Sequence, residues 1–223
     1  MSSPAPNPRP IPTTPRRAII SPDTLRGDAS PLARTPPGQT LTSKWPVLHF
    51  GALPRIDLAR WRLRFFGACD NPYELSFDDF HALIGAAGAD VHCDIHCVTH
   101  WSRLNNIFTG VPTRLLVDRA RPRPDARFVM QHANSDPAPG FTVNLPLDDF
   151  TRDDALFAAY HDGEPLSAEH GGPVRAVVPG LYFWKGAKWI MGVEFTASDA
   201  PGFWETSGYH MRGDPWREER FGW

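Results

Sequence analysis

The clearest pattern of hydrophobic and polar positions in the chain runs over residues 89–98, ADVHCDIHCV. From Val91 onward, one side carries Val91, Cys93, Ile95 and Cys97, and the other carries His92, Asp94 and His96. Residues two apart lie on the same face of a β-strand. The stretch therefore predicts a strand that Cys97 closes, just before the polar segment THWSRLNN.

A helix is predicted in the stretch NPYELSFDDFHALIG, starting after Ser76. Serine suits the N-cap position, because its side chain can accept a hydrogen bond from a free backbone N–H of the first turn. Asp78 and Asp79 would fall in that first turn, where the helix dipole favours negative charge. Phe80 and Ile84 then supply an apolar face for packing.

The other elements that the pattern predicts are short. Strands are expected at 45–51, 61–67, 126–133, 174–184 and 188–195, and at the start of 140–150, before a Pro break and a helix. Short helices are expected at 110–120 and in 154–166, ahead of a DGEP turn. Many short strands with a few short helices predict a β-rich α+β domain and not a doubly wound sheet.

Proline sets the N-terminal part of the chain apart. Residues 1–38 are rich in Pro and hold little apolar material, so this segment cannot offset its ordering entropy by burial. We expect an extended tail over 1–38 and a single domain over 39–223. The 24 Pro of the whole chain also argue against a helical bundle.

Charge and cysteine content narrow the partners and the compartment. A net charge of −2 gives no general attraction to nucleic acid or to a membrane surface, and no apolar run is long enough to span a bilayer. Three Cys make a poor disulfide framework, so a reducing compartment, the cytoplasm, is expected. Arg16 and Arg17 form a twin-arginine pair, but the apolar stretch that follows is too short for an export signal.

The segment HCDIHCVTHW, residues 92–101, is dense in potential metal ligands. On a strand, however, Cys93 and Cys97 are about 13 Å apart, because each residue advances the chain by about 3.3 Å. A zinc site built from this cluster is therefore disfavoured. Cys69 and Cys93 suit plain core positions, whereas Cys97 at the strand end can be a core thiol, a single metal ligand or a nucleophile.

A second group of residues lies in HGGPVRAVVPGLYFWKGAKWIMGVEF, residues 170–195. His170, Arg175, Lys185 and Lys188 are spaced here among glycines and apolar runs. Arg offers a planar fork of donors for phosphate and Lys a compact charge, so the group suggests an anion pocket. The alternative is a pair of strands with solvated basic residues. A cofactor that carries both a thiolate-binding metal and a phosphate, such as molybdenum–molybdopterin, would unite this group with Cys97.

These motifs resemble a known family. IHCVTHWS, residues 95–102, followed by HGGPVRAVVPGLYFWKGAKW, residues 170–189, is similar to the molybdopterin-binding domain of the sulfite oxidase family. The segments 36–51 and 208–223 look like its short bacterial branch, which is related to the catalytic subunit of the methionine sulfoxide reductase system. The resemblance covers about residue 36 to the end and implies the β-rich, mixed sulfite oxidase-type fold in one domain.

The resemblance also implies roles for matching positions. Cys97 matches the cysteine whose sulfur ligates molybdenum. The cofactor contacts that it implies are His49, His132, Asn144, His170, Arg175, Gly186, Ala187 and Lys188. His100, Trp101 and Arg103 follow the ligand and are expected near the substrate, with Trp101 equally suited to plain packing and Arg103 to a surface salt bridge. The tail 209–220 is expected to form a structural cap or a docking surface.

The implied activity is oxygen-atom and two-electron transfer on a small oxo-substrate, either sulfite or an S- or N-oxide. Sulfite oxidases proper carry Gly-Asn-x-Arg after the ligand cysteine, whereas residues 98–101 here are VTHW, so sulfite is in question. With neither an immunoglobulin-like nor a cytochrome domain expected, electrons would be exchanged with a separate protein. The alternatives are a zinc-binding protein, or a cofactor-carrying subunit without turnover of its own.

Overall fold

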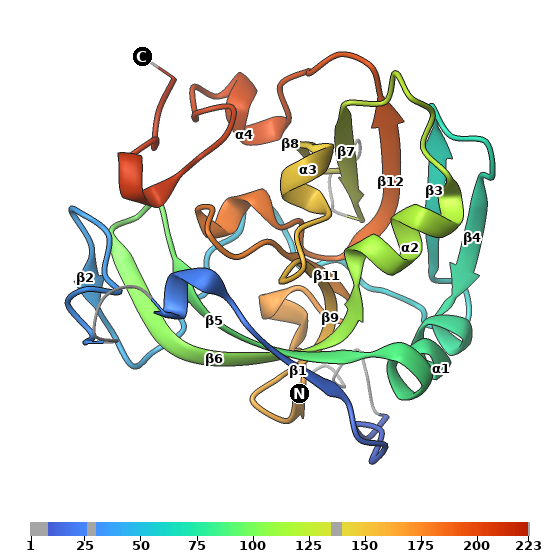
Figure 1. Cartoon of the computed structure of the whole chain (residues 1–223), viewed down its shortest axis with the longest axis horizontal. Helices are drawn as coiled ribbons and strands as arrows, with labels where there is room; N and C mark the ends of the chain where they lie inside the picture. Colours follow the sequence, from blue (N-terminus) through green and yellow to red (C-terminus); the bar gives the residue numbers. More distant parts are fainter. Residues whose placement is uncertain (1–8, 26–29, 135–139, 223) are drawn as a thin grey trace.

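The computed structural model describes residues 9–25, 30–134 and 140–222, and it is built around two mixed β-sheets (Figure 1). The larger sheet has the order β1-β5-β6-β9-β10, with β2 added to β6 and β11 added to β9. Its strands are β1 (Arg17–Ile20), β2 (Thr40–Leu41), β5 (Ala89–His96), β6 (Trp101–Pro112), β9 (Leu156–His161), β10 (Glu164–Pro165) and β11 (Arg175–Val177).

The second sheet has the order β4-β3-β12-β7-β8. Its strands are β3 (Arg62–Gly67), β4 (Tyr73–Ser76), β7 (Phe128–Ala133), β8 (Thr142–Pro146) and β12 (Ile190–Thr196). Strand β12 runs parallel to β3 and antiparallel to β7. This two-sheet, β-rich arrangement confirms the fold class that the sequence predicts.

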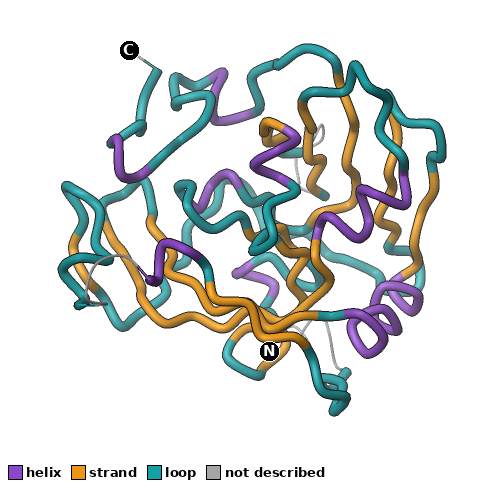
Figure 2. Tube along the Cα trace, in the orientation of Figure 1, coloured by secondary structure: helices purple, strands orange, loops and turns teal. Residues whose placement is uncertain are grey.

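Helices are few and short, and strands and loops make up most of the trace (Figure 2). They are α1 (Phe77–Ala87), α2 (Thr113–Ala120), α3 (Leu147–Phe150) and α4 (Phe203–Thr206), with 3-10 turns η1 (Pro22–Leu25), η2 (Ala168–His170), η3 (Phe183–Lys185) and η4 (Pro215–Arg217). The prediction for α1 is confirmed: Ser76 and Asp79 form a reciprocal capping box, and Phe80 and Ile84 are buried. No helix in the described part of the chain is both long and apolar enough to cross a membrane.

Three sequence expectations about elements are wrong. The stretch predicted as a helix in 154–166 forms strand β9, whose LFAAY core is fully buried on both faces and so lacks a period of two. Residues 45–51 form no strand and lie irregularly along the cavity described below. Only Arg175–Val177 of the strand expected at 174–184 exists, because Pro179 and Gly180 turn the chain away.

The N-terminal segment contributes to the larger sheet. Strand β1 pairs in parallel with β5, in the register Arg17 with Ala89, and Arg16 donates to the Asp90 carboxylate at 2.9 Å. Farther along, Arg34 forms a bidentate pair with the buried Asp94. The polar side of β5 is therefore covered by residues that precede the globular pattern in the sequence.

Candidate functional site

A cavity of about 260 Å³ opens between the carboxyl end of β5 and the loop that precedes β12. Its walls come from six separate stretches of the chain, and aromatic side chains dominate them. The lining residues are Trp45, Pro46, Leu48, His49, Phe50, Cys97, Val98, Thr99, Trp101, Phe141, Val143, Arg175, Phe183, Trp184, Gly186, Ala187, Lys188, Trp189, Trp204 and Tyr209. Six of the residues predicted to hold the metal or the cofactor thus share one cavity: His49, Cys97, Arg175, Gly186, Ala187 and Lys188.

Cys97 follows directly after β5, in a tight turn that leads into β6. Its N–H donates to Trp101 O at 2.8 Å, and its carbonyl accepts from the His100 N–H at 3.1 Å. Its thiol Sγ lies 3.1 Å from Thr99 Oγ1. Burial raises the pKa of this thiol, while the contact with Thr99 opposes the rise. The turn thus holds a single thiol, partly buried, at the wall of the cavity.

Arg175 is the buried cation of the site, with 1% of its surface exposed. Its guanidinium donates to the carbonyls of His170 at 3.0 Å and Gly186 at 3.3 Å, and lies 4.0 Å from the centre of the Phe183 ring. Burial lowers its pKa to about 9, so it keeps its charge at neutral pH. Its Nε also donates to Ala176 O at 3.3 Å, so all three hydrogen-bond partners are carbonyls and the charge remains available to an anion.

Lys188 faces the same cavity. Its Nζ donates to the carbonyls of Leu48 at 2.9 Å and Glu169 at 2.6 Å. Burial, and secondly the charge of Arg175, lower its pKa to about 7. An anion placed here would stabilise the charged form of this lysine.

Glycine is required beside these cations. A Cβ on Gly186 would lie 2.3 Å from Ala176 O, so only glycine permits the close approach of this loop to β11.

Two predicted residues lie beside the cavity without lining it. The His170 ring stacks on the lining residue Trp45, with 3.9 Å between centroids, and its Nε2 donates to Trp45 O at 3.2 Å. Asn144 Oδ1 accepts from Lys185 Nζ at 2.8 Å, behind the cavity wall.

Three other predicted residues are engaged away from the lining. His132 Nε2 pairs with the Glu194 carboxylate at 3.0 Å. His100 Nδ1 donates to Gly38 O at 2.8 Å, and Arg103 pairs with Asp162 at 2.7 Å. Of the residues that follow Cys97, the structure brings Val98, Thr99 and Trp101 to the cavity.

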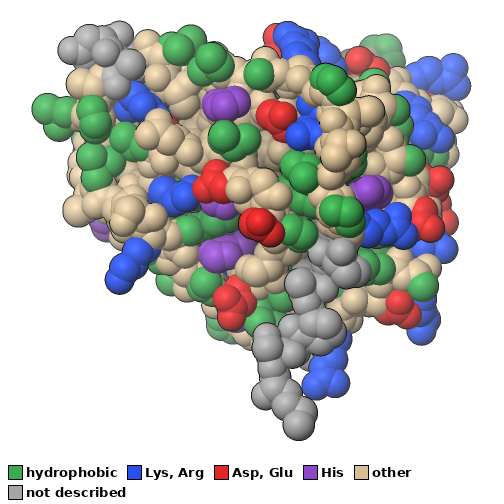
Figure 3. All heavy atoms as spheres, turned by 90° about the horizontal axis from the view of Figure 1, so that it is seen from below, with side chains coloured by type: hydrophobic (Ala, Val, Ile, Leu, Met, Phe, Trp, Pro, Cys, Tyr) green, Lys and Arg blue, Asp and Glu red, His purple; other side chains and the backbone are tan. Residues whose placement is uncertain are grey.

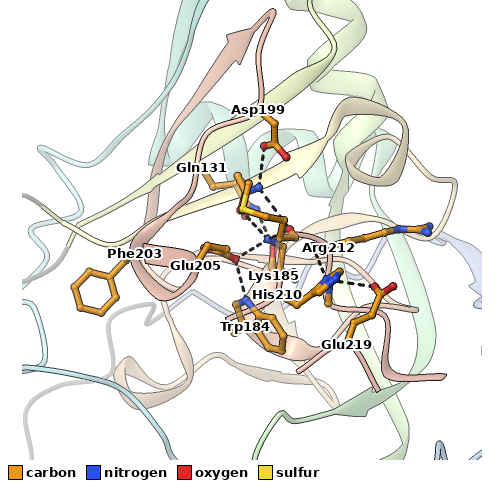
Figure 4. Close-up of polar contacts among 12 residues, drawn as sticks. Gln131, Trp184, Lys185, Asp199, Phe203, Glu205, His210, Arg212 and Glu219 are labelled. Carbon is orange, nitrogen blue, oxygen red and sulfur yellow. Dashed lines mark hydrogen bonds and ion pairs between the residues drawn. The ribbon is translucent and has the colours of Figure 1, made fainter. Parts of the chain in front are cut away.

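Lys185 plays a different part from the anion-binding one suggested by its sequence. Its ammonium is fully buried and lies 2.6 Å from Glu205 Oε1, in the network drawn in Figure 4. The same oxygen accepts from Trp184 Nε1 at 3.0 Å. The pair ties η3 to α4, the two elements that supply Trp184 and Trp204 to the cavity wall.

Sequence reasoning missed this pair and the aromatic wall, because Glu205 has no local pattern that marks its partner. The wall includes Tyr209, whose ring centroid lies 5.1 Å from that of Trp184 and 5.2 Å from that of Trp204.

The donor set decides what kind of metal the site suits. Within residues 9–25, 30–134 and 140–222, no three His, Cys, Asp or Glu side chains are grouped closely enough to hold a metal ion. One soft sulfur beside two cations suits a metal whose remaining ligands belong to an anionic organic cofactor. These residues therefore fit molybdenum–molybdopterin.

Comparison with known proteins agrees with this donor set. The family of the oxidoreductase molybdopterin binding domain matches residues 50–204. The chain belongs to this family. It is 48% identical over 191 residues to the uncharacterized oxidoreductase YuiH of Bacillus subtilis (strain 168), covering 85% of this chain and 93% of YuiH. The sulfite oxidase-like resemblance is thereby confirmed, and the chain is a molybdopterin-binding oxidoreductase.

Two more distant matches are longer proteins. The protein-methionine-sulfoxide reductase catalytic subunit MsrP of Xanthomonas axonopodis pv. citri (strain 306) is 28% identical, covering 82% of this chain and 62% of MsrP. The sulfane dehydrogenase SoxCD from Paracoccus pantotrophus shares the fold with a TM-score of 0.57 at 20% identity, over 66% of this chain and 40% of that chain. The chain thus spans less than two thirds of both proteins.

Proposed function

We propose that this protein binds molybdenum–molybdopterin with the Cys97 thiolate as a ligand of the metal, and that it transfers an oxygen atom and two electrons to or from a small oxo-substrate. The observation that supports this most is the meeting of Cys97 with Arg175 and Lys188 in one cavity. These residues lie on different elements, and only the folded chain brings the soft ligand and the cations together.

Each residue then has a physical task. Arg175 and Lys188 attract the anionic part of the cofactor, and Gly186 lets the backbone approach it closely. The thiolate of Cys97 supplies a soft donor to the metal. When bound, the cofactor supplies the oxygen-atom and redox chemistry, while the protein supplies orientation and exclusion of water.

The lining favours an organic S- or N-oxide over sulfite as the substrate. Arg175 and Lys188 are the only Arg and Lys among the described lining residues, and both are assigned to the cofactor in this proposal. The rest of the wall is mainly aromatic, including Trp101, Trp204 and Tyr209. Such a surface suits an apolar organic group better than a small dianion.

We also propose a separate redox protein as the electron partner, as expected from the sequence. The surface gives no strong electrostatic preference on the face seen in Figure 3, where basic and acidic side chains are interspersed. The partner is therefore best sought by function, with a viologen dye as its substitute in the assay.

Cys97→Ser tests the assignment of the metal ligand. We expect wild-type protein to carry about one molybdenum per chain with its pterin, and the variant to stay folded but lose turnover of S- or N-oxides with reduced viologen. Cys69→Ala is the matched control, because Cys69 is buried outside the cavity. Full activity of Cys97→Ser, or wild-type protein without molybdenum, would refute the proposal.

A further inference from the structure

Arg220, near the carboxyl end of the chain, returns to the turn that carries Cys97. Its Nη1 donates to Val98 O at 2.7 Å, and its Nη2 lies 3.4 Å from Pro37 O and 3.5 Å from Gly38 O. The guanidinium also lies 4.9 Å from the centre of the Tyr182 ring. In Figure 1 the red carboxy-terminal segment accordingly runs beside the carboxyl end of β5 and the amino end of β6.

This guanidinium is buried, and the Glu218 carboxylate lies near it without forming an ion pair: a Cβ on Gly38 would lie 2.7 Å from Glu218 Oε1 and 3.2 Å from Arg220 Nη2. Only 6% of Arg220 is exposed, and in the described part of the chain no carboxylate lies within ion-pair distance of it. A buried cation whose hydrogen bonds all go to carbonyls is costly, and negative charge placed close to it lowers that cost. The carbonyl that Arg220 Nη1 contacts belongs to Val98, the residue next to Cys97, so a metal-bound thiolate of Cys97 would place negative charge close to this cation.

A second set of long-range contacts holds the same turn. Gln39 Nε2 donates to Cys97 O at 3.1 Å, and the Thr40 N–H donates to His100 O at 2.8 Å. The short strand β2 continues this contact, with Thr40 in register with Trp101. The turn 97–100 is therefore held both by residues 38–40 and by Arg220, two parts of the chain that are distant in sequence.

We propose that Arg220 is a positioning residue for the Cys97 thiolate: it fixes the turn 97–100 and supplies the buried positive charge that offsets the metal-bound sulfur. This inference rests on the proposed function for the role of Cys97. It assigns a task to the tail 209–220, which the sequence marks only as a cap or a docking surface.

Two variants separate the charge of Arg220 from its geometry. Arg220→Gln removes the charge, and Arg220→Lys keeps the charge but loses the fork of donors. Arg217→Gln is the control from the same tail. The Arg217 side chain is 68% exposed and forms an ion pair with Glu219.

The first measurement is amide hydrogen exchange in the cofactor-free full-length chain, which does not depend on activity. A hydrogen bond from a charged donor to a buried carbonyl restrains local opening, so we expect exchange at residues 97–101 to accelerate roughly tenfold or more in Arg220→Gln. The second measurement is molybdenum content together with the molybdenum electron paramagnetic resonance spectrum of the loaded protein. We expect less metal and an altered spectrum in Arg220→Gln, partial recovery of both in Arg220→Lys, and no change in Arg217→Gln.

If amide hydrogen exchange at residues 97–101 were as slow in Arg220→Gln as in the wild-type protein, the proposal would be overturned. Faster exchange combined with unchanged molybdenum content and an unchanged spectrum would overturn it too, since the restraint would then have no consequence for the ligand. If the wild-type protein held no molybdenum, the proposed function would fail instead, while the exchange measurement would still decide whether Arg220 restrains the turn. Should Arg220→Gln not fold, Arg220→Lys still tests the restraint.

Discussion

Among single residues, the fully buried pair of Lys185 and Glu205 has the clearest energetic consequence. Glu205→Gln keeps the size of the side chain but leaves the Lys185 ammonium buried without its counter-charge. Breaking one partner of a buried ion pair costs about 3–5 kcal/mol, so we expect a loss of that order in the free energy of unfolding, measured with urea. In the control Glu74→Gln, which removes a half-exposed carboxylate, the loss should stay below about 1 kcal/mol.

A loss in Glu205→Gln no greater than in Glu74→Gln would contradict this assignment. It would mean that Lys185 loses its proton inside the protein at little cost. Burial does lower the pKa of Lys185, with Glu205 opposing the shift, so removal of the carboxylate should push that pKa lower still.

The same pair explains the limit of sequence reasoning about the site. Cys97 is recognisable because it ends an alternating strand, and Arg175 and Lys188 because they stand among glycines. Lys185 looks equivalent to Lys188 in FWKGAKW, yet one is fully buried against Glu205 and the other faces the cavity. Only the tertiary contact between η3 and α4 separates them.

At the level of elements, local signals determine which predictions hold. Helix α1 is predictable because its capping box and apolar face lie within one short stretch. Strand β5 is predictable from its alternation, although Asp94 on its polar side is in fact buried against Arg34. Strand β9 is not, because a strand buried on both faces has the same uninterrupted apolar run as a buried helix.

Strand β6 escaped the sequence prediction for another reason. Its first half, WSRLNN, is polar at most positions, and its pairing with β5 is broken by a bulge between Cys93 and Ile95. No regular alternation survives such an interruption. No element is predicted from the sequence for the residues that follow Cys97, whereas Trp101 already opens a long strand.

Strand β1 offers a prediction at the level of elements. The Ser21 N–H donates to His92 O at 2.9 Å, and alternation in a parallel ladder places the Ile19 N–H on the same side. Ile19→Pro should remove that hydrogen bond, and the measured free energy of unfolding should fall by roughly 1–3 kcal/mol. Ala18→Pro is the matched control, because the Ala18 N–H points away from β5. The free energy of unfolding should therefore fall much less in this variant. Equal losses in the two variants would show that β1 contributes no ladder bond to the sheet.

For the whole molecule, the cavity links parts of both sheets, so loading the cofactor should stabilise the entire domain. Lining residues come from the irregular segment at Leu48, from the turn after β5, from β8 at Val143 and from the loop that ends at Lys188. A ligand that binds only the folded state raises the unfolding temperature by mass action. We expect the loaded protein to melt well above the cofactor-free chain, in a single transition, by calorimetry.

The variant Lys188→Met should lose most of this difference in melting temperature. Lys44→Met should keep it, because Lys44 is exposed and lies outside the lining. Equal melting temperatures for loaded and cofactor-free protein would contradict the expectation, because a cofactor held by several separate segments cannot bind tightly and leave their unfolding unaffected.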